Sequence, residues 1–420
     1  LIANLRTSGH IQVIQKKNTV KELLMMRRQV GKQVFAQHRT RTRHNMFDTA
    51  NASNKCINQH GDNSPEPQCK YAKLEPAYDT SPAPVTPEVV DFPPLTSVPN
   101  GHITPPQMQH HQHLQAPAAE IKMTLFQWQV QQEAQKFECV SPEMLQMQDA
   151  DGDTCLHIAV AQGRRALTYV LAGKMAIYGF LDLKEHNGQT PLQLAVATNQ
   201  HLIVRDLLEH GAQINTQDLW GRSPLHVCAE KGHFLSLRSI CSLIGSEQTI
   251  DVEMFNFDGL TPLHVAVLAH NAVIREMRTL ENPCAYRLME LTQRKHIYME
   301  CIRTLLVMGA SYGKPDLKSG RTCLHIASEE ANVELFQLFL NQSSSLSIVN
   351  VKTFSGNSAL HIVSSLQNHK TQVEAVKLLM RKGADPGTRN FENELPSQLV
   401  PEGPIGEKIR QILKGKNVHA

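Results

Sequence analysis

The chain has 420 residues, of which 41% are apolar, a formal charge of +3 and nine cysteines. This length suffices for one large core or two domains with tails, and the near-neutral charge means that any basic signal must be local. The cysteines are scattered, odd in number and without a C-x-x-C pair, which indicates reduced thiols and argues against a disulfide scaffold or a zinc site. No apolar run approaches the roughly 18 residues of a membrane span. Because the chain begins at Leu1 rather than Met, we expect it to be part of a longer product.

Residues 1–44 form a basic segment with ten Lys or Arg residues against one acid. Helical spacing of the apolar residues around position 20 predicts a short amphipathic helix, which is marginal alone and would fold on a partner. The stretch is Asn18, Thr19, Val20, Lys21, Glu22, Leu23 and Leu24. It resembles the short peptide of OCA-type coactivators, which implies a POU-domain transcription factor as partner; a solvated basic linker is the alternative. Further on, Arg39, Arg41 and Arg43 are compatible with a nuclear-import signal or a phosphate-contacting arm.

Residues 45–122 contain twelve prolines among polar residues and show no apolar periodicity. Such a segment buries too little surface to offset its ordering entropy, so we predict a disordered arm rich in Pro, Gln and His. Three histidines, His110, His111 and His113, are better explained by a low-complexity tract than by a metal site. A transactivating arm and an inert linker both fit this composition.

Residues 123–148 are predicted to form an N-terminal capping helix. Leu125, Trp128 and Gln132 fall on one helical face, with Phe126 and Val130 beside it. Repeat arrays need such a cap over their first exposed apolar face. We therefore expect this helix to cover the end of the first repeat.

Residues 149–416 repeat one pattern, whose clearest copy is Gly259-Leu-Thr-Pro-Leu-His264. Six copies follow one another with glycine intervals of 36, 33, 38, 61 and 36 residues. Glycine permits a turn with positive φ, Ser or Thr caps the following helix, Pro suits its first position, and Leu points into the core. A spacing near 33 with T-P-L-H-x-A is the ankyrin signature. The histidine, present in five copies, is expected to form hydrogen bonds within and between repeats rather than to act as a ligand or base.

The predicted fold class is therefore an all-α ankyrin-repeat solenoid, built from helix-turn-helix repeats with β-hairpin fingers and preceded by a disordered arm. We expect about seven repeats, the last one degenerate around Asn390–Val400. The interval of 61 exceeds 33 by 28 residues, which places an insertion near 272–296 as a surface excursion; it serves as a partner contact or is a harmless expansion. The C-terminal basic residues suit DNA phosphates or form a solvated helix face: Lys408, Arg410, Lys414 and Lys416.

Several stretches resemble the atypical nuclear members of the I-kappa-B family. They include Phe126-Gln-Trp-Gln-Val130, Trp220-Gly-Arg222 through Gly232, and Leu379-Met-Arg-Lys-Gly-Ala-Asp385. The resemblance implies a nuclear regulator that binds NF-kappa-B dimers, prefers small-subunit homodimers and reaches DNA through its partner. It also implies a role in inflammatory and innate-immune gene expression, with activation and repression both open. Large apolar residues at the finger tips are candidate anchors, or else pack between fingers: Trp220, Phe255, Phe257, Phe354 and Phe391.

Two alternatives remain. A cytoplasmic I-kappa-B would remove the dimer from DNA, but such proteins carry an Asp-Ser-Gly-x-x-Ser signal and an acidic tail, neither of which occurs here. A generic ankyrin scaffold would have another partner. An enzyme is disfavoured, because no phosphate-cradling glycine loop, metal-spaced cluster or nucleophile motif is present, and we expect neither a cofactor nor a membrane partner.

Overall fold

The computed structural model describes residues 123–243, 249–342, 345–367 and 369–415. The N-terminal helix stretch, the arginines at 39, 41 and 43, the Pro-rich arm and Lys416 lie outside these residues. In the described part, no helix is both long and apolar enough to cross a membrane. Its elements are helices joined by turns, and a single β-bridge, Lys352 with Ser358, lies outside any named strand.

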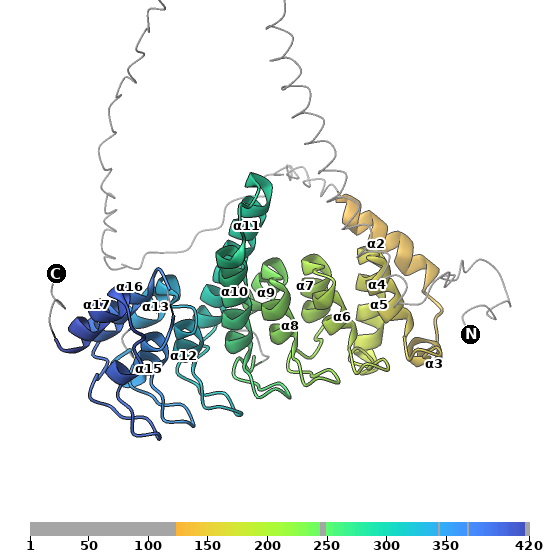
Figure 1. Ribbon diagram of the computed structural model, residues 1–420. Helices are drawn as coiled ribbons and strands as arrows, with labels where there is room; N and C mark the ends of the chain where they lie inside the picture. The colour runs from red at the N-terminus through yellow and green to blue at the C-terminus, as the bar shows by residue number, and fades with distance from the viewer. Residues whose placement is uncertain (1–122, 244–248, 343–344, 368, 416–420) are drawn as a thin grey trace, which may run out of the picture. The chain divides into compact units, whose positions relative to one another are not determined.

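Two short helices precede the repeats, and each repeat then contributes an antiparallel pair (Figure 1). The first two helices are α2 (Leu125–Lys136) and α3 (Pro142–Gln146). The repeat pairs are α4 (Cys155–Gln162) with α5 (Arg165–Ile177), α6 (Pro191–Ala197) with α7 (His201–Glu209), α8 (Pro224–Lys231) with α9 (Phe234–Cys241), α10 (Pro262–Thr279) with α11 (Ala285–Val307), α12 (Cys323–Ser328) with α13 (Val333–Leu340), and α15 (Ala359–Ser364) with α16 (Gln372–Arg381). A short α14 (Ser345–Ile348), a 3₁₀ turn η2 (Pro396–Gln398) and α17 (Pro404–Leu413) complete the order.

The first helix of each repeat begins where the motif predicts. In α6, Thr190 accepts a hydrogen bond from the backbone N–H of Gln193, whose side chain accepts one from the Thr190 N–H in return. Pro191 occupies the first helical turn, where its missing N–H costs nothing. This reciprocal cap recurs at the start of α4, α8, α10, α12 and α15.

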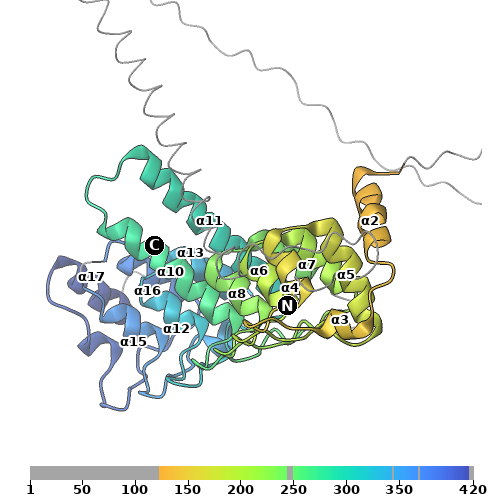
Figure 2. The ribbon, with the colours of Figure 1, turned by 90° about the vertical axis from the view of Figure 1, so that its right-hand side faces the viewer.

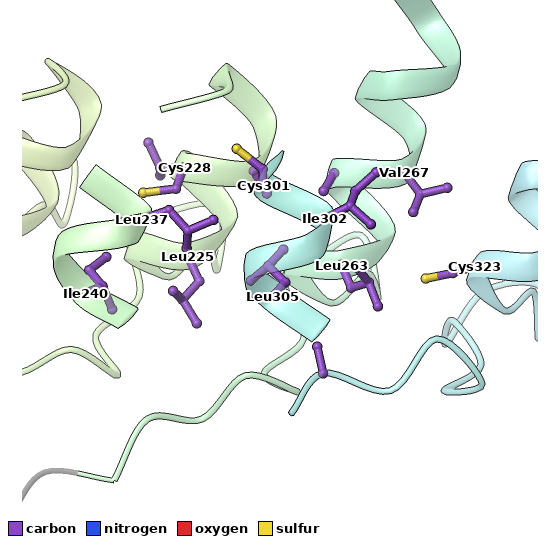
Figure 3. Packing of buried hydrophobic residues seen from close by; sticks show 14 of the residues in the cluster. Leu225, Cys228, Leu237, Ile240, Leu263, Val267, Cys301, Ile302, Leu305 and Cys323 are labelled. Atoms are coloured by element: carbon purple, nitrogen blue, oxygen red, sulfur yellow. The ribbon is translucent and has the colours of Figure 1, made fainter. Parts of the chain in front are cut away.

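Neighbouring pairs stack in chain order, so that α4 packs on α6, α6 on α8, α8 on α10, α10 on α12 and α12 on α15. Between pairs the chain forms fingers, which extend from one end of the helices (Figure 1). The helix-pair interfaces are filled by one continuous cluster of buried side chains. Figure 3 shows this core at the third and fourth repeats, where Leu225 and Leu237 lie opposite Ile302 and Leu305.

The cysteines of the described residues are free thiols, and three of them are fully buried. Burial raises the pKa of Cys301 to about 12, and the Cys228 and Cys323 pKa values are raised for the same reason. These thiols therefore stay protonated and act as small apolar groups in the core.

The insertion predicted near 272–296 is not an irregular loop. It lengthens both helices of the fourth repeat, to 18 residues in α10 and 23 in α11, against 8 in α8. Both views show the two helices side by side, extending beyond their neighbours at the end away from the fingers (Figures 1 and 2). The excess residues thus form a helical hairpin, which we call the α10–α11 hairpin.

The capping helix α2 turns a different face to the array than the sequence pattern suggested. Leu125 and Trp128, the residues expected to pack, are 71% and 51% exposed. Phe126 instead contacts α5, with its ring 5.7 Å from that of Tyr169 and 4.0 Å from the guanidinium of Arg165. An edge-on aromatic pair and a cation over a ring favour this orientation. The contact is therefore partly polar, which apolar periodicity alone does not reveal.

Candidate protein-binding surface

Each finger ends in a tight turn that the side chain at its first position holds together. In the third finger, Asp218 Oδ1 accepts hydrogen bonds from the backbone N–H groups of Trp220 at 3.0 Å and Arg222 at 2.8 Å. Asn256 Oδ1 repeats this arrangement in the next finger, at 3.0 Å to Asp258 and to Leu260. Short polar side chains form such turns because they reach their own backbone two and four residues on.

The same turn chemistry explains a group of three aspartates in the first finger. The carboxylate oxygens of Asp149, Asp151 and Asp153 lie within 4.8 Å of one another. Asp149 Oδ1 accepts from the N–H groups of the other two, at 2.9 and 3.0 Å. The group is thus the first finger's version of the capped turn.

The second residue of each turn contacts the preceding finger. Its backbone N–H donates to a carbonyl there, as Phe257 does to Trp220 at 3.2 Å and Phe354 to Ser319 at 2.9 Å. Its side chain lies over the motif glycine of the preceding repeat. The pairs are His186 over Gly152, Leu219 over Gly188, Phe257 over Gly221, Leu317 over Gly259, Phe354 over Gly320 and Phe391 over Gly356.

This register produces a row of apolar side chains along the finger tips. Each side chain packs against the preceding finger on one side, yet between 60% and 75% of it remains exposed. We call these residues the finger-tip row: Leu219, Phe257, Leu317, Phe354 and Phe391. A row of rigid apolar groups on ordered turns is typical of a protein-binding surface.

Of the five predicted anchors, the structure brings Phe257, Phe354 and Phe391 together in the row. Trp220 lies beside it, 53% exposed, with the Arg222 guanidinium 4.7 Å from its ring. Phe255 differs, because it is half-buried and the Lys314 ammonium lies 5.6 Å from its ring. Phe255 is therefore not a tip residue.

Two members of the row, Leu219 and Leu317, were not among the predicted anchors, all of which are aromatic. The available signal was position: in the third and fourth fingers the exposed residue stands two before the motif glycine, as Leu219 and Phe257 do. In the fifth finger the turn is one residue longer, so Leu317 stands three before Gly320.

The motif histidines are structural and join successive repeats. His226 Nδ1 accepts from the Ser223 N–H at 3.1 Å, and its Nε2–H donates to the Leu260 carbonyl at 2.9 Å. This pattern needs the neutral ring, and burial accordingly lowers the pKa of His226 to about 4. Four further histidines bond in the same way: His157, His264, His325 and His361.

The predicted basic group at the C-terminal end is only partly available. Lys408 is exposed on α17, and Lys414 is exposed directly after the helix ends. Arg410 instead donates to the carbonyl oxygens of Val400 and Pro401, at 2.8 and 3.3 Å, and pairs with Glu407. Arg410 therefore fixes the end of the array.

Comparison with known proteins places these features in a class. A family model described as ankyrin repeats (3 copies) matches residues 118–218 and 288–390. The chain is 57% identical over 300 residues to NF-kappa-B inhibitor zeta from Homo sapiens, which covers 71% of the chain but 42% of that relative. It is 41% identical over 278 residues to NF-kappa-B inhibitor delta from Mus musculus, covering 66% of the chain and 81% of the relative.

The fold and the repeated turns define an ankyrin-repeat protein. With most of the delta relative covered at this identity, the chain belongs to the ankyrin-repeat family of NF-kappa-B inhibitors. It spans about two fifths of the length of the zeta relatives, at 41–42%. A solved structure, the ankyrin repeat domain of Bcl-3, described as a member of the I-kappa-B protein family, is 32% identical, covers 62% of the chain and 99% of that domain, and has a TM-score of 0.49.

Proposed function

We propose that this chain is a nuclear regulator of transcription that binds an NF-kappa-B dimer through the finger-tip row while the dimer stays on DNA. The printed names of its relatives, inhibitors zeta and delta of NF-kappa-B, support the partner class. The row itself carries the proposal, because five apolar side chains stand exposed on turns that hydrogen bonds hold in place. Ordered anchors lose little conformational entropy on binding.

The preferred dimer is the small-subunit homodimer, and the regulated genes are those of inflammation and innate immunity. Tolerance of DNA is supported by the C-terminal end, where Lys408 and Lys414 are exposed and would not repel phosphates. A dissociating inhibitor would compete with DNA for the dimer instead.

The test is a gel-shift titration of the full chain onto a small-subunit NF-kappa-B homodimer bound to its DNA site, at roughly physiological salt because charge contacts depend on salt. We expect a slower ternary band, which the variant Trp220→Ala/Phe354→Ala should weaken. Release of free DNA would identify a dissociating inhibitor and overturn the proposal. Absence of any change would identify an ankyrin scaffold for another partner.

A further inference from the structure

The α10–α11 hairpin has a surface of its own, separate from the finger-tip row. Helix α10 begins at Pro262, next to its finger, and runs 18 residues to Thr279. At a rise of about 1.5 Å per residue, the far end lies about 27 Å along the helix from that finger. The hairpin tip therefore lies well away from the finger-tip row.

Ion pairs hold the hairpin together and fix it to the array. Across the hairpin, Glu276 of α10 pairs with both Arg287 and Arg294 of α11. Val273 and Leu291 are buried between the helices. The hairpin is thus a folded part of the array.

Its attachment to the fifth repeat is also ionic. Glu330, 3% exposed, binds Arg275 at 2.7 Å and Arg278 at 2.8 Å. Lys295 of α11 pairs with Glu334 at 2.7 Å. Because these ion pairs reach the last turn of α10, the hairpin offers a partner a fixed surface, which lowers the entropy cost of binding.

The outer face of α11 carries no Lys, Arg, Asp or Glu over three turns. The exposed positions recur at i, i+3, i+4, i+7, i+8 and i+11, and they are Ala285, Leu288, Met289, Thr292, Gln293 and His296. Leu288 and Met289 are 46% and 63% exposed. The four charged residues of the same turns are all paired: Arg287, Glu290, Arg294 and Lys295. An exposed helix face normally carries the charges, so this segregation marks a contact surface.

The size of the face decides between occupants. Eleven residues of rise span about 17 Å, and one helix face of that length is far below the roughly 800 Å² per partner of a stable protein interface. A second copy of the chain would gain too little from it to form a stable dimer. One helix of about three turns matches it in length, and the apolar side chains of such a helix would cover Leu288 and Met289 without needing an ionic partner.

We propose that the outer face of α11 binds a short amphipathic helix of a second protein, through an apolar stripe with spacing i, i+3, i+4 and i+7. The chain then joins two proteins, one at the fingers and one at the hairpin. This site stands independently of the proposed NF-kappa-B partner.

The test uses the full chain and a labelled 15-residue helical peptide with leucines at those four positions and Gln, Ser and Ala elsewhere. Fluorescence anisotropy should show a dissociation constant in the range of about 10–100 μM, as suits a small interface. The variant Leu288→Glu/Met289→Glu should weaken binding at least tenfold. The control Leu346→Glu, at a still more exposed leucine of α14, and Phe354→Ala should leave it unchanged.

A peptide with the same residues in scrambled order should not bind. Equal binding of both peptides, equal binding to the hairpin variant, or no binding at 0.5 mM would overturn the proposal. Sedimentation of the chain at the same concentrations provides a second readout. Self-association that Leu288→Glu/Met289→Glu abolishes would assign the face to a second copy and overturn the proposal as well.

Discussion

The ring of Phe257 lies where a side chain on Gly221 would have to be. A Cβ built on Gly221 would stand 2.4 Å from the Phe257 ring and 2.8 Å from its backbone nitrogen. The glycine of one repeat therefore creates the seat for the exposed aromatic residue of the next. The glycine turn that recurs from repeat to repeat therefore also positions the exposed side chains of the finger-tip row.

Replacing this glycine should damage both stability and binding. Gly221 has a φ of 72°, so alanine costs about 1–3 kcal/mol in backbone strain and about 1–3 kcal/mol more for the overlap with Phe257. Gly211 is the control, because its φ is 91° and a Cβ there would meet nothing within 4 Å. Urea unfolding should show a larger loss in the free energy of unfolding for Gly221→Ala than for Gly211→Ala. Equal losses would contradict the close contact between Gly221 and Phe257.

Acid should destabilise the array through its motif histidines. Burial lowers the pKa of His157, His226 and His325 to about 4, against about 6.5 in an unfolded chain. The unfolded state then binds more protons between these values. The stability that these neutral histidines contribute is fully present above pH 6.5 and is lost as pH falls toward 4. At pH 5 the loss is about 2 kcal/mol per histidine.

Gln193 shows how to test this, since it stands at the histidine position of the second repeat without titrating. Its amide accepts from the Thr190 N–H and donates to the Thr216 and Arg222 carbonyls. Glutamine at positions 157, 226 and 325 together should make the free energy of unfolding fall less between pH 7 and pH 5. An unchanged slope would show that these histidines do not carry the acid sensitivity.

The pair of Arg165 and Asp206 should be sensitive to loss of one partner. Arg165 binds both carboxylate oxygens, at 2.6 and 2.8 Å, and Asp206 is 2% exposed. Asp206→Ala leaves the guanidinium without its buried anion and should cost about 3–5 kcal/mol. The double variant Arg165→Met/Asp206→Ala should recover part of that loss in thermal unfolding, whereas additive losses would contradict a direct pairing.

Glu330 should control the order of the α10–α11 hairpin. Its carboxylate binds Arg275 and Arg278 of α10 from a buried position. Glu330→Gln keeps the shape but removes the charge, so amide hydrogen exchange should rise in residues 272–296. Glu329→Gln is the control, because Glu329 pairs with Arg321 at 2.8 Å, away from α10; an equal effect there would assign the change to general destabilisation.

The features predicted correctly from the sequence are those that contacts between near neighbours in the chain determine. Thr190, Pro191 and the motif glycines fix helix starts and turns through contacts within a few residues, so the pattern predicts them. The prediction of which face of α2 packs on the array was wrong. The guanidinium of Arg165, 39 residues away from Phe126, sets the orientation of the helix. The hairpin was unpredictable for the same reason, since the partners of Glu276 lie 11 and 18 residues away across a turn.

The most direct test of the finger-tip row is the affinity of the full chain for a small-subunit NF-kappa-B homodimer on DNA, measured for two triple variants. One removes row residues, Phe257→Ala/Phe354→Ala/Phe391→Ala. The other removes equally exposed apolar groups elsewhere, Ile177→Ala/Val307→Ala/Leu346→Ala. Anchors each contribute more than about 1 kcal/mol, so the row variant should bind about a hundredfold more weakly while the control binds like the parent chain. Equal affinities for the two variants would contradict the account.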